Sequence, residues 1–215
     1  MHNIRAILFD LDGVIIDSEP LHFEAHKKVL EKYKIKLSLE DYMRFGVAKG
    51  DNILYEKMSE KFGMPINKSE ISQRKKQAYW EILDKKGELM PEILEILQNF
   101  SKKYDLAIVS SGVKASVEHV LDKFNVRKYF EVVITGEDVE KIKPFPDVYS
   151  KALEKLERSK EECIAIEDSQ TGIEAAKNAG LKCIAIPNEF TKNHDFSQAD
   201  IILSSAKELV DIVNR

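Results

Sequence analysis

Residues 4–19 read IRAILFDLDGVIIDSE, where an apolar run stops at Asp10 and a second carboxylate, Asp12, follows two positions later. Side chains at positions i and i+2 of an extended chain point to the same side, so Asp10 and Asp12 can face one pocket. Two carboxylates this close repel each other unless a cation or a hydrogen-bond donor lies between them. Two explanations are therefore open: a strand that ends in an Asp-Gly turn, or a strand that ends in a charged functional site.

The composition is that of an ordinary soluble globular protein. The chain has 215 residues, 43% of them hydrophobic and 33% charged, which is long enough for a core domain with a smaller inserted one. The 33 basic and 37 acidic residues are interspersed and give a net charge of −4, so no nucleic-acid partner is expected. No apolar run approaches the roughly 18 residues of a membrane span, so no membrane partner is expected either.

The cysteines and the first residues bear on the cellular compartment. Cys163 and Cys183 each lie in an apolar, strand-like run, which favours two buried thiols over a disulfide or a metal site. The chain enters the apolar run 4–9 without the basic and apolar regions of a signal peptide. We therefore expect a cytoplasmic protein.

Six short apolar runs predict the strands of a sheet. They are continuous runs rather than alternations of apolar and polar residues, which is typical of a parallel sheet covered on both faces. Segments with helical periodicity alternate with the later runs, and this order predicts a doubly wound α/β fold. The predicted strands are 4–9, 105–109, 131–134, 162–166, 182–186 and 200–203, and the helices between them are 92–103, 114–124, 147–157 and 170–179.

One long insertion interrupts this order. About ninety residues separate the first two predicted strands, whereas a single crossover requires about a dozen. We therefore expect a core domain of residues 1–17 and 91–215 and an inserted helical cap domain of residues 18–90. Its position directly after the acidic loop suits a lid, and a monomer fits a lid that must move. The helices expected in the insertion are 20–33, 39–45, 51–62 and 67–86.

Polar side chains follow four of the predicted strands. Ligands of doubly wound folds bind beyond the carboxyl ends of the strands, where these side chains are expected to meet. Each of them alone can be explained as a helix cap or a turn residue, but four coincidences at one sheet edge favour a functional site. They are Asp10 and Asp12 after the first strand, Ser110 after the second, Lys143 after the third, and Glu167 and Asp168 after the fourth.

The chemistry of these groups suits phosphoryl transfer. Asp10 and Asp168, with Glu167, supply oxygen ligands without any histidine or thiolate, which indicates Mg²⁺ rather than zinc. The metal ion, the Lys143 ammonium and the Ser110 hydroxyl can bind phosphoryl oxygens that carboxylates alone would repel. Asp10 is then the candidate nucleophile, which forms an aspartyl phosphate. Asp12 is the candidate acid and base that serves the leaving oxygen and the attacking water.

These motifs resemble those of the haloacid dehalogenase superfamily, in its β-phosphoglucomutase-like branch. The resemblance rests on Asp10-Leu-Asp12-Gly, Ser110, Lys143-Pro and Glu167-Asp168-Ser-x-Thr-Gly-Ile, which span nearly the whole chain. It implies a Rossmann-like core with a small α-helical cap. It also implies that Asp10 is both the nucleophile and a Mg²⁺ ligand, and that Asp12 is the acid and base and binds the metal through its main-chain carbonyl. By the same resemblance, Asp168 is a metal ligand, and Glu167 binds the metal directly or through water.

The same resemblance assigns substrate-binding candidates outside these motifs. His22 and Lys75 match a histidine and a lysine of the mutase, whereas Lys49 stands where the mutase has an arginine and loses the bidentate fork. The segment that starts at Ser111 is less basic than in the mutase. These departures favour a hydrolase of small phosphorylated metabolites, principally sugar phosphates, over a β-phosphoglucomutase. A binding module without turnover is a third, minor alternative.

Overall fold

The computed structural model describes residues 3–213. The chain divides into two compact units, Met1–Ile16 with Leu89–Arg215, and Asp17–Glu88. In the described part of the chain, no helix has the length and apolar character that a membrane crossing requires.

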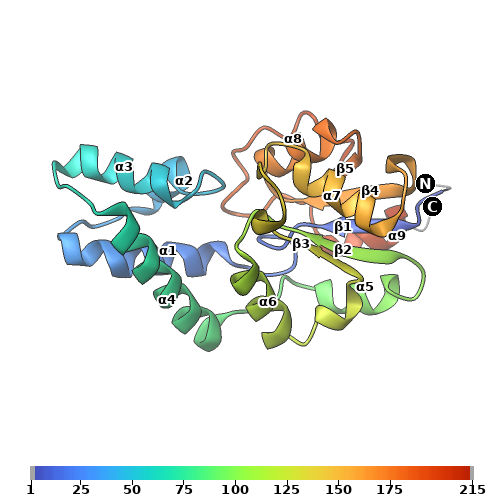
Figure 1. Ribbon diagram of the computed structural model, residues 1–215, viewed down its shortest axis with the longest axis horizontal. Helices are drawn as coiled ribbons and strands as arrows, with labels where there is room; N and C mark the ends of the chain where they lie inside the picture. The colour runs from blue at the N-terminus through green and yellow to red at the C-terminus, as the bar shows by residue number, and fades with distance from the viewer. Residues whose placement is uncertain (1–2, 214–215) are drawn as a thin grey trace. The chain divides into compact units, whose positions relative to one another are not determined.

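The larger unit is built on a six-stranded parallel sheet with the order β3-β2-β1-β4-β5-β6 (Figure 1). Strand β1 lies between β2 and β4, with Ala6 opposite both Asp105 and Cys163. This sheet, with its crossover helices, confirms the predicted α/β fold class. The strands are β1 (Ala6–Phe9), β2 (Asp105–Val109), β3 (Val132–Ile134), β4 (Cys163–Glu167), β5 (Lys182–Ala185) and β6 (Ile201–Ile202).

The two faces of the sheet carry side chains of different size. Toward α7 and α8 the strands present mostly small residues, together with Leu8, Val109 and Ile134, and these form one buried cluster with Val148 and Tyr149 of α7. Because side chains alternate along a strand, larger residues such as Ile7 and Phe9 point to the other face, where Figure 1 places α5 and α6. The small residues are Ala6, Ala107, Cys163, Ala165, Cys183 and Ala185. The helices are α5 (Ile93–Phe100), α6 (Lys114–Lys123), α7 (Asp147–Leu156), α8 (Gln170–Asn178) and α9 (Leu209–Val213).

Three details of this unit bear on the sequence predictions. Both cysteines are free and buried, as expected. The helix expected at 92–103 is shorter, because Glu92 has a left-handed backbone with φ +61° and α5 begins only after it. Helix α9 was not expected, since its five residues are too few to show a periodic pattern.

The smaller unit is entirely helical. Helices α1 (Glu19–Leu30) and α4 (Lys68–Lys86) pack against each other, and α2 (Leu39–Phe45) and α3 (Asp51–Phe62) complete the unit. Local signals fix its helix ends: the side chain of Ser38 accepts a hydrogen bond from the Asp41 amide at the start of α2. Gly63 adopts a left-handed conformation with φ +62° and ends α3, a conformation that glycine takes without a steric penalty.

A buried polar network lies inside this helical unit. His26, which is 3% exposed, contacts the Tyr55 hydroxyl through Nδ1 at 2.9 Å and Asp51 Oδ1 through Nε2 at 3.4 Å. Both contacts are satisfied when Nε2 carries the proton and Nδ1 accepts from Tyr55. Burial lowers the pKa of His26 to about 4, against the opposing effect of its hydrogen bond to Asp51. The imidazole is therefore neutral at neutral pH.

The neutral His26 predicts a loss of stability in mild acid. The unfolded chain takes up a proton near the ordinary pKa of 6.5, whereas the folded chain resists it down to about 4. The contribution of His26 to stability is therefore complete above pH 6.5 and is lost as the pH drops toward 4, by up to about 3 kcal/mol. The measurement is urea unfolding of the helical unit at several pH values, followed by the fluorescence of Trp80, the single tryptophan of the chain.

The matched variants are His26→Gln and His119→Gln. The first should flatten the pH dependence of the unfolding free energy between pH 6.5 and 4, because the titrating group is gone. The second removes a half-buried histidine of α6 and should leave the dependence unchanged. An unaltered slope in His26→Gln would contradict the assignment.

Candidate active site

The acidic loop begins where β1 ends. The Asp10 amide donates to the Ile166 carbonyl at 3.0 Å, which continues the pairing of β1 with β4 by one residue and fixes the place of the Asp10 side chain. Asp10 is 8% exposed and Asp12 is half-buried. Gly13 then turns the chain with φ +73°. The charge of Asp12 acts on Asp10, so the two carboxylates of the DLDG motif are neighbours in the fold.

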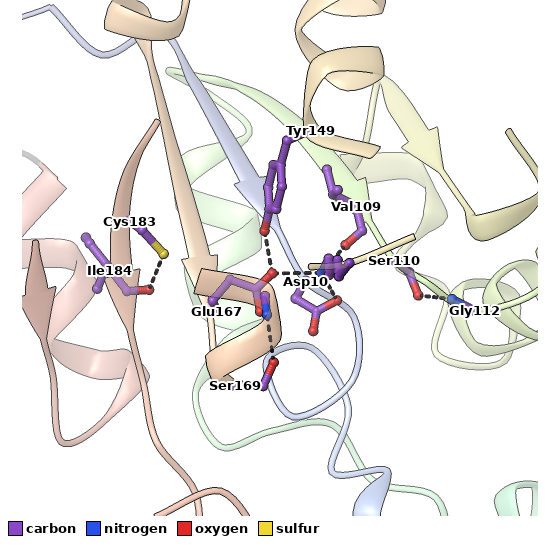
Figure 2. A network of polar contacts seen from close by, with 11 residues as sticks. Asp10, Val109, Ser110, Gly112, Tyr149, Glu167, Ser169, Cys183 and Ile184 are labelled. Carbon is purple, nitrogen blue, oxygen red and sulfur yellow. Dashed lines mark hydrogen bonds and ion pairs between the residues drawn. The ribbon is translucent and has the colours of Figure 1, made fainter. Parts of the chain in front are cut away.

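A single ammonium group connects the ends of three strands. Lys143 Nζ donates to Asp10 Oδ1 at 2.8 Å, to the Val109 carbonyl at 2.8 Å and to Glu167 Oε1 at 2.7 Å. Figure 2 shows Asp10, Val109 and Glu167 converging from β1, β2 and β4. The three acceptors match the three N–H groups of an ammonium, and the side chain is only 6% exposed.

Burial and charge act in opposite directions on this pair. Burial raises the pKa of Asp10 to about 7, while Lys143 lowers it and the neighbouring charges of Glu167 and Asp12 raise it further. Burial alone would lower the pKa of Lys143, but Asp10 and Glu167 outweigh burial and hold it above its ordinary value. Lys143 is therefore a permanent cation in this site. The carboxylates around it require further positive charge to be fully ionised.

Glu167 is completely buried and is held by two donors on one oxygen. Oε1 accepts from Lys143 and from the Tyr149 hydroxyl of α7. Oε2 is also buried, and no residue from 3 to 213 donates a hydrogen bond to it. A Cβ atom at Gly172 would lie 1.9 Å from Oε2, so the glycine of the TGI sequence is required for this carboxylate to fit. The sequence analysis missed Tyr149, because no sequence motif distinguishes a functional tyrosine in this helix from an aromatic residue of the core.

Asp168 has a partner that the sequence analysis also missed. The side-chain amide of Asn188 donates to Asp168 Oδ2 at 2.7 Å. A Cβ atom at Gly13 would lie 2.1 Å from the same oxygen and 2.7 Å from Asn188 Nδ2, so the backbone of the DLDG loop approaches this contact closely. Asn188 follows β5, a strand end that the sequence analysis did not consider. A polar residue directly after an apolar strand was the sequence signal that could have identified Asn188 as a candidate site residue.

Three carboxylates gather at a spacing suited to a metal ion. Asp10, Glu167 and Asp168 each offer one oxygen, and these oxygens lie within 4.8 Å of one another. An all-oxygen donor set suits Mg²⁺, and the buried Glu167 Oε2, which has no donor, fits a cation nearby. The side chain of Asp12 is not part of this group, and a main-chain role for Asp12 in metal binding stays a prediction.

The two serines after β2 do not cap the following helix. Helix α6 has Val113 at its N-cap without a side-chain cap. Ser110 is 1% exposed, and its Oγ accepts from the Gly112 amide at 3.0 Å. The Oγ atom of Ser111 is buried and has no hydrogen-bond partner in the described part of the chain. Burying a hydroxyl without a hydrogen-bond partner costs free energy, so a ligand oxygen that accepts from Ser111 would remove this unfavourable contribution.

Within the helical unit, two of the three predicted residues share a neighbour. The rings of His22 and Tyr79 stack with centroids 4.2 Å apart, and Lys75 Nζ lies 5.7 Å from the Tyr79 centroid. Lys75 is nearly buried and donates to Asp51 Oδ1 at 3.2 Å. Lys49 is exposed and donates to the Arg44 carbonyl at 2.6 Å. Substrate binding by these residues stays a prediction.

Comparison with known proteins agrees with the motifs. Residues 7–186 match the family model of haloacid dehalogenase-like hydrolases. A phosphorylated carbohydrates phosphatase of Thermotoga maritima is 36% identical over 185 residues, which cover 84% of this chain and 84% of the relative. A crystal structure of mutant CbbY from Rhodobacter sphaeroides with xylulose-(1,5)bisphosphate is 28% identical, with a TM-score of 0.84 over 94% of each chain.

A mutase shares the fold as well. The crystal structure of β-phosphoglucomutase from Clostridium difficile has a TM-score of 0.80 at 20% identity, over 98% of this chain and 96% of the other. The family model covers most of the sequence and includes all four motifs predicted to form the site. The chain therefore belongs to the haloacid dehalogenase-like hydrolases, in their β-phosphoglucomutase-like branch.

Proposed function

We propose that this protein is a Mg²⁺-dependent phosphatase of small phosphorylated metabolites, principally sugar phosphates, acting through an aspartyl phosphate on Asp10. The contact that carries the proposal is the 2.8 Å bond from Lys143 to Asp10 Oδ1 beside the carboxylates of Glu167 and Asp168. This hydrogen bond occupies Oδ1 of the buried Asp10 carboxylate. We therefore assign the attack on phosphorus to the other oxygen, Oδ2. A fixed nucleophile beside a permanent cation is the arrangement that phosphoryl transfer requires.

The proposed reaction has two displacements at phosphorus. Asp10 Oδ2 forms a bond to phosphorus while the ester P–O bond breaks, and Asp12 gives its proton to the leaving oxygen. Asp12 then takes a proton from water, which attacks the phosphorus and breaks its bond to Asp10. Ser110 and Ser111 bind the phosphoryl oxygens in both steps, and the positive charge of Lys143 beside Asp10 stabilises the negative charge on them. The products are the dephosphorylated metabolite and inorganic phosphate.

The acidic side chains have a second role in the proposal. Asp10 and Asp168 would hold Mg²⁺ with the main-chain carbonyl of Asp12, and Glu167 would bind it directly or through water. When bound, the ion supplies positive charge that neutralises the phosphoryl oxygens and the surrounding carboxylates. The buried, donor-free Glu167 Oε2 supports this assignment.

The substrate class is inferred from relatives and from the helical unit. One relative is named for phosphorylated carbohydrates, and another was solved with a sugar bisphosphate. We propose that residues 18–90 act as a cap on a core of 1–17 and 91–215. In this cap, His22, Lys49 and Lys75 contribute to substrate binding. We also propose a cytoplasmic monomer, for which the two free thiols suit a reducing compartment.

A β-phosphoglucomutase is the second candidate function. The observation in its favour is Lys75, a nearly buried cation fixed by Asp51 that is suited to hold a second phosphate. Against it stand Lys49, which lacks the bidentate fork of arginine, and the neutral Ser111-Gly112-Val113 segment. A binding module without turnover is less favoured, since the nucleophile and the lysine are both present.

The fate of the phosphoryl group separates the two enzymes. With β-glucose 1-phosphate and a trace of the 1,6-bisphosphate, we expect free phosphate rather than glucose 6-phosphate, because water is the proposed acceptor. Coupled assays follow both products. A wider panel of sugar phosphates, polyol phosphates and nucleotides then defines the range, and no turnover of any ester with Mg²⁺ would leave only the binding module.

Loss of the nucleophile should abolish turnover without unfolding the protein. Asp10→Asn keeps the shape of the side chain but removes the attacking oxygen, so kcat should fall by at least about 1000-fold. Circular dichroism checks that the fold is retained. Asp122→Asn, which changes an exposed carboxylate of α6, is the control and should keep full activity. Activity of Asp10→Asn near the wild-type level would refute the assignment.

Loss of the proton carrier should affect both displacements. Asp12→Asn can neither protonate the leaving oxygen nor activate water, so both steps should slow by about 100-fold or more. Rapid-quench measurement of the phosphoenzyme separates formation from breakdown. Single-turnover rates equal to those of the wild type would remove Asp12 from the mechanism.

A further inference from the structure

We propose that Asn188 is a positioning residue of the metal site, whose side-chain amide holds the Asp168 carboxylate in the orientation that Mg²⁺ binding requires. The inference rests on the proposed function, because that proposal makes Asp168 a metal ligand. Asn188 lies outside the four motifs of the site. It would act through Asp168 and not by touching the substrate.

The contact is short and partly buried, with a half-buried donor and a buried acceptor. Asn188 Nδ2 donates to Asp168 Oδ2 at 2.7 Å, and Asp168 is 4% exposed. The orientation of the amide follows from its other contacts, because Oδ1 already accepts from the backbone amides of Phe190 and Thr191 at 2.9 and 3.2 Å. The nitrogen must therefore face the carboxylate.

The backbone around Asn188 holds its side chain in place. Its own amide donates to Thr191 Oγ1 at 3.1 Å, and its carbonyl accepts from the Lys192 amide at 2.9 Å. Thr191, whose hydroxyl accepts this hydrogen bond, is only 1% exposed. The turn is also joined to the site, since the Ile186 amide donates to the Glu167 carbonyl at 2.7 Å. The donor is thus fixed before any metal binds.

Asp168 is confined by two neighbours that meet at the same oxygen. Asn188 Nδ2 donates to Oδ2, and the backbone of Gly13 packs beside both atoms and leaves no room there for a Cβ atom. A carboxylate confined in this way cannot turn freely away from Asp10 and Glu167 under their repulsion. Hydrogen bonds to metal-binding groups typically contribute 10–100-fold in metal affinity. The same size of effect is expected for the amide of Asn188.

The test compares Asn188→Ser with Asn99→Ser by calorimetric titration of the metal-free protein with Mg²⁺ alone. Serine keeps a weaker acceptor for the turn but cannot reach Asp168, so the Kd for Mg²⁺ should rise by about 10–100-fold. Asn99 is exposed on α5, and its variant should bind like the wild type. At saturating Mg²⁺, kcat of Asn188→Ser should recover, which a purely structural defect would not allow.

Each remaining outcome is decisive. An unchanged Kd in a folded Asn188→Ser variant would overturn the role of Asn188 and leave the proposed phosphatase intact. Absence of Mg²⁺ binding by the wild type would overturn the metal site and this inference together. If the variant does not fold, the side-chain ¹⁵N resonance of Asn188 is followed in the wild type during Mg²⁺ titration. A shift that saturates with binding supports the proposal, and an unmoved resonance refutes it.

Discussion

The Lys143 ammonium is the group on which the rest of the site depends. It meets a carboxylate from β1, a carbonyl from β2 and a carboxylate from β4 within 2.8 Å of each. Parallel strands bring their carboxyl ends to one edge, but nothing in the sheet itself balances the acidic side chains that follow them. Without this cation, Asp10 and Glu167 would be buried charges without a counterion, which costs several kcal/mol in proteins.

Close packing around the carboxylates, together with the Lys143 ammonium, holds them in place. Gly13 and Gly172 lie where any side chain would collide with Asp168 or Glu167. Tyr149 and Asn188 supply hydrogen bonds to the same two carboxylates. The site is therefore built less from the four motifs alone than from the contacts that confine their carboxylates.

Sequence analysis predicted the parts of this molecule that follow from local pattern. Continuous apolar runs revealed the strands, and the long helical interval after Asp12 revealed the insertion, because both signals are short-range. The convergence of Asp10, Lys143 and Glu167 was predicted from the geometry of parallel sheets alone.

The residues that the sequence analysis missed depend on contacts between distant segments. Tyr149 and Asn188 approach their partners only when α7 and the turn after β5 are in place, and no spacing rule encodes that approach. The start of α5 was misplaced for another reason, since Glu92 has a left-handed backbone that glutamate rarely adopts and that no sequence pattern predicts.

The unequal side-chain sizes on the two faces of the sheet have a consequence for how the catalytic centre can change. Small residues such as Ala6 and Ala107 let α7 lie close to the sheet, and Tyr149 of that helix then reaches Glu167. One added methyl group on this face would press on the helix that carries the tyrosine. A change of side-chain volume in the core can therefore shift the acidic cluster. Substitutions far from any substrate atom can change the catalytic rate in this way.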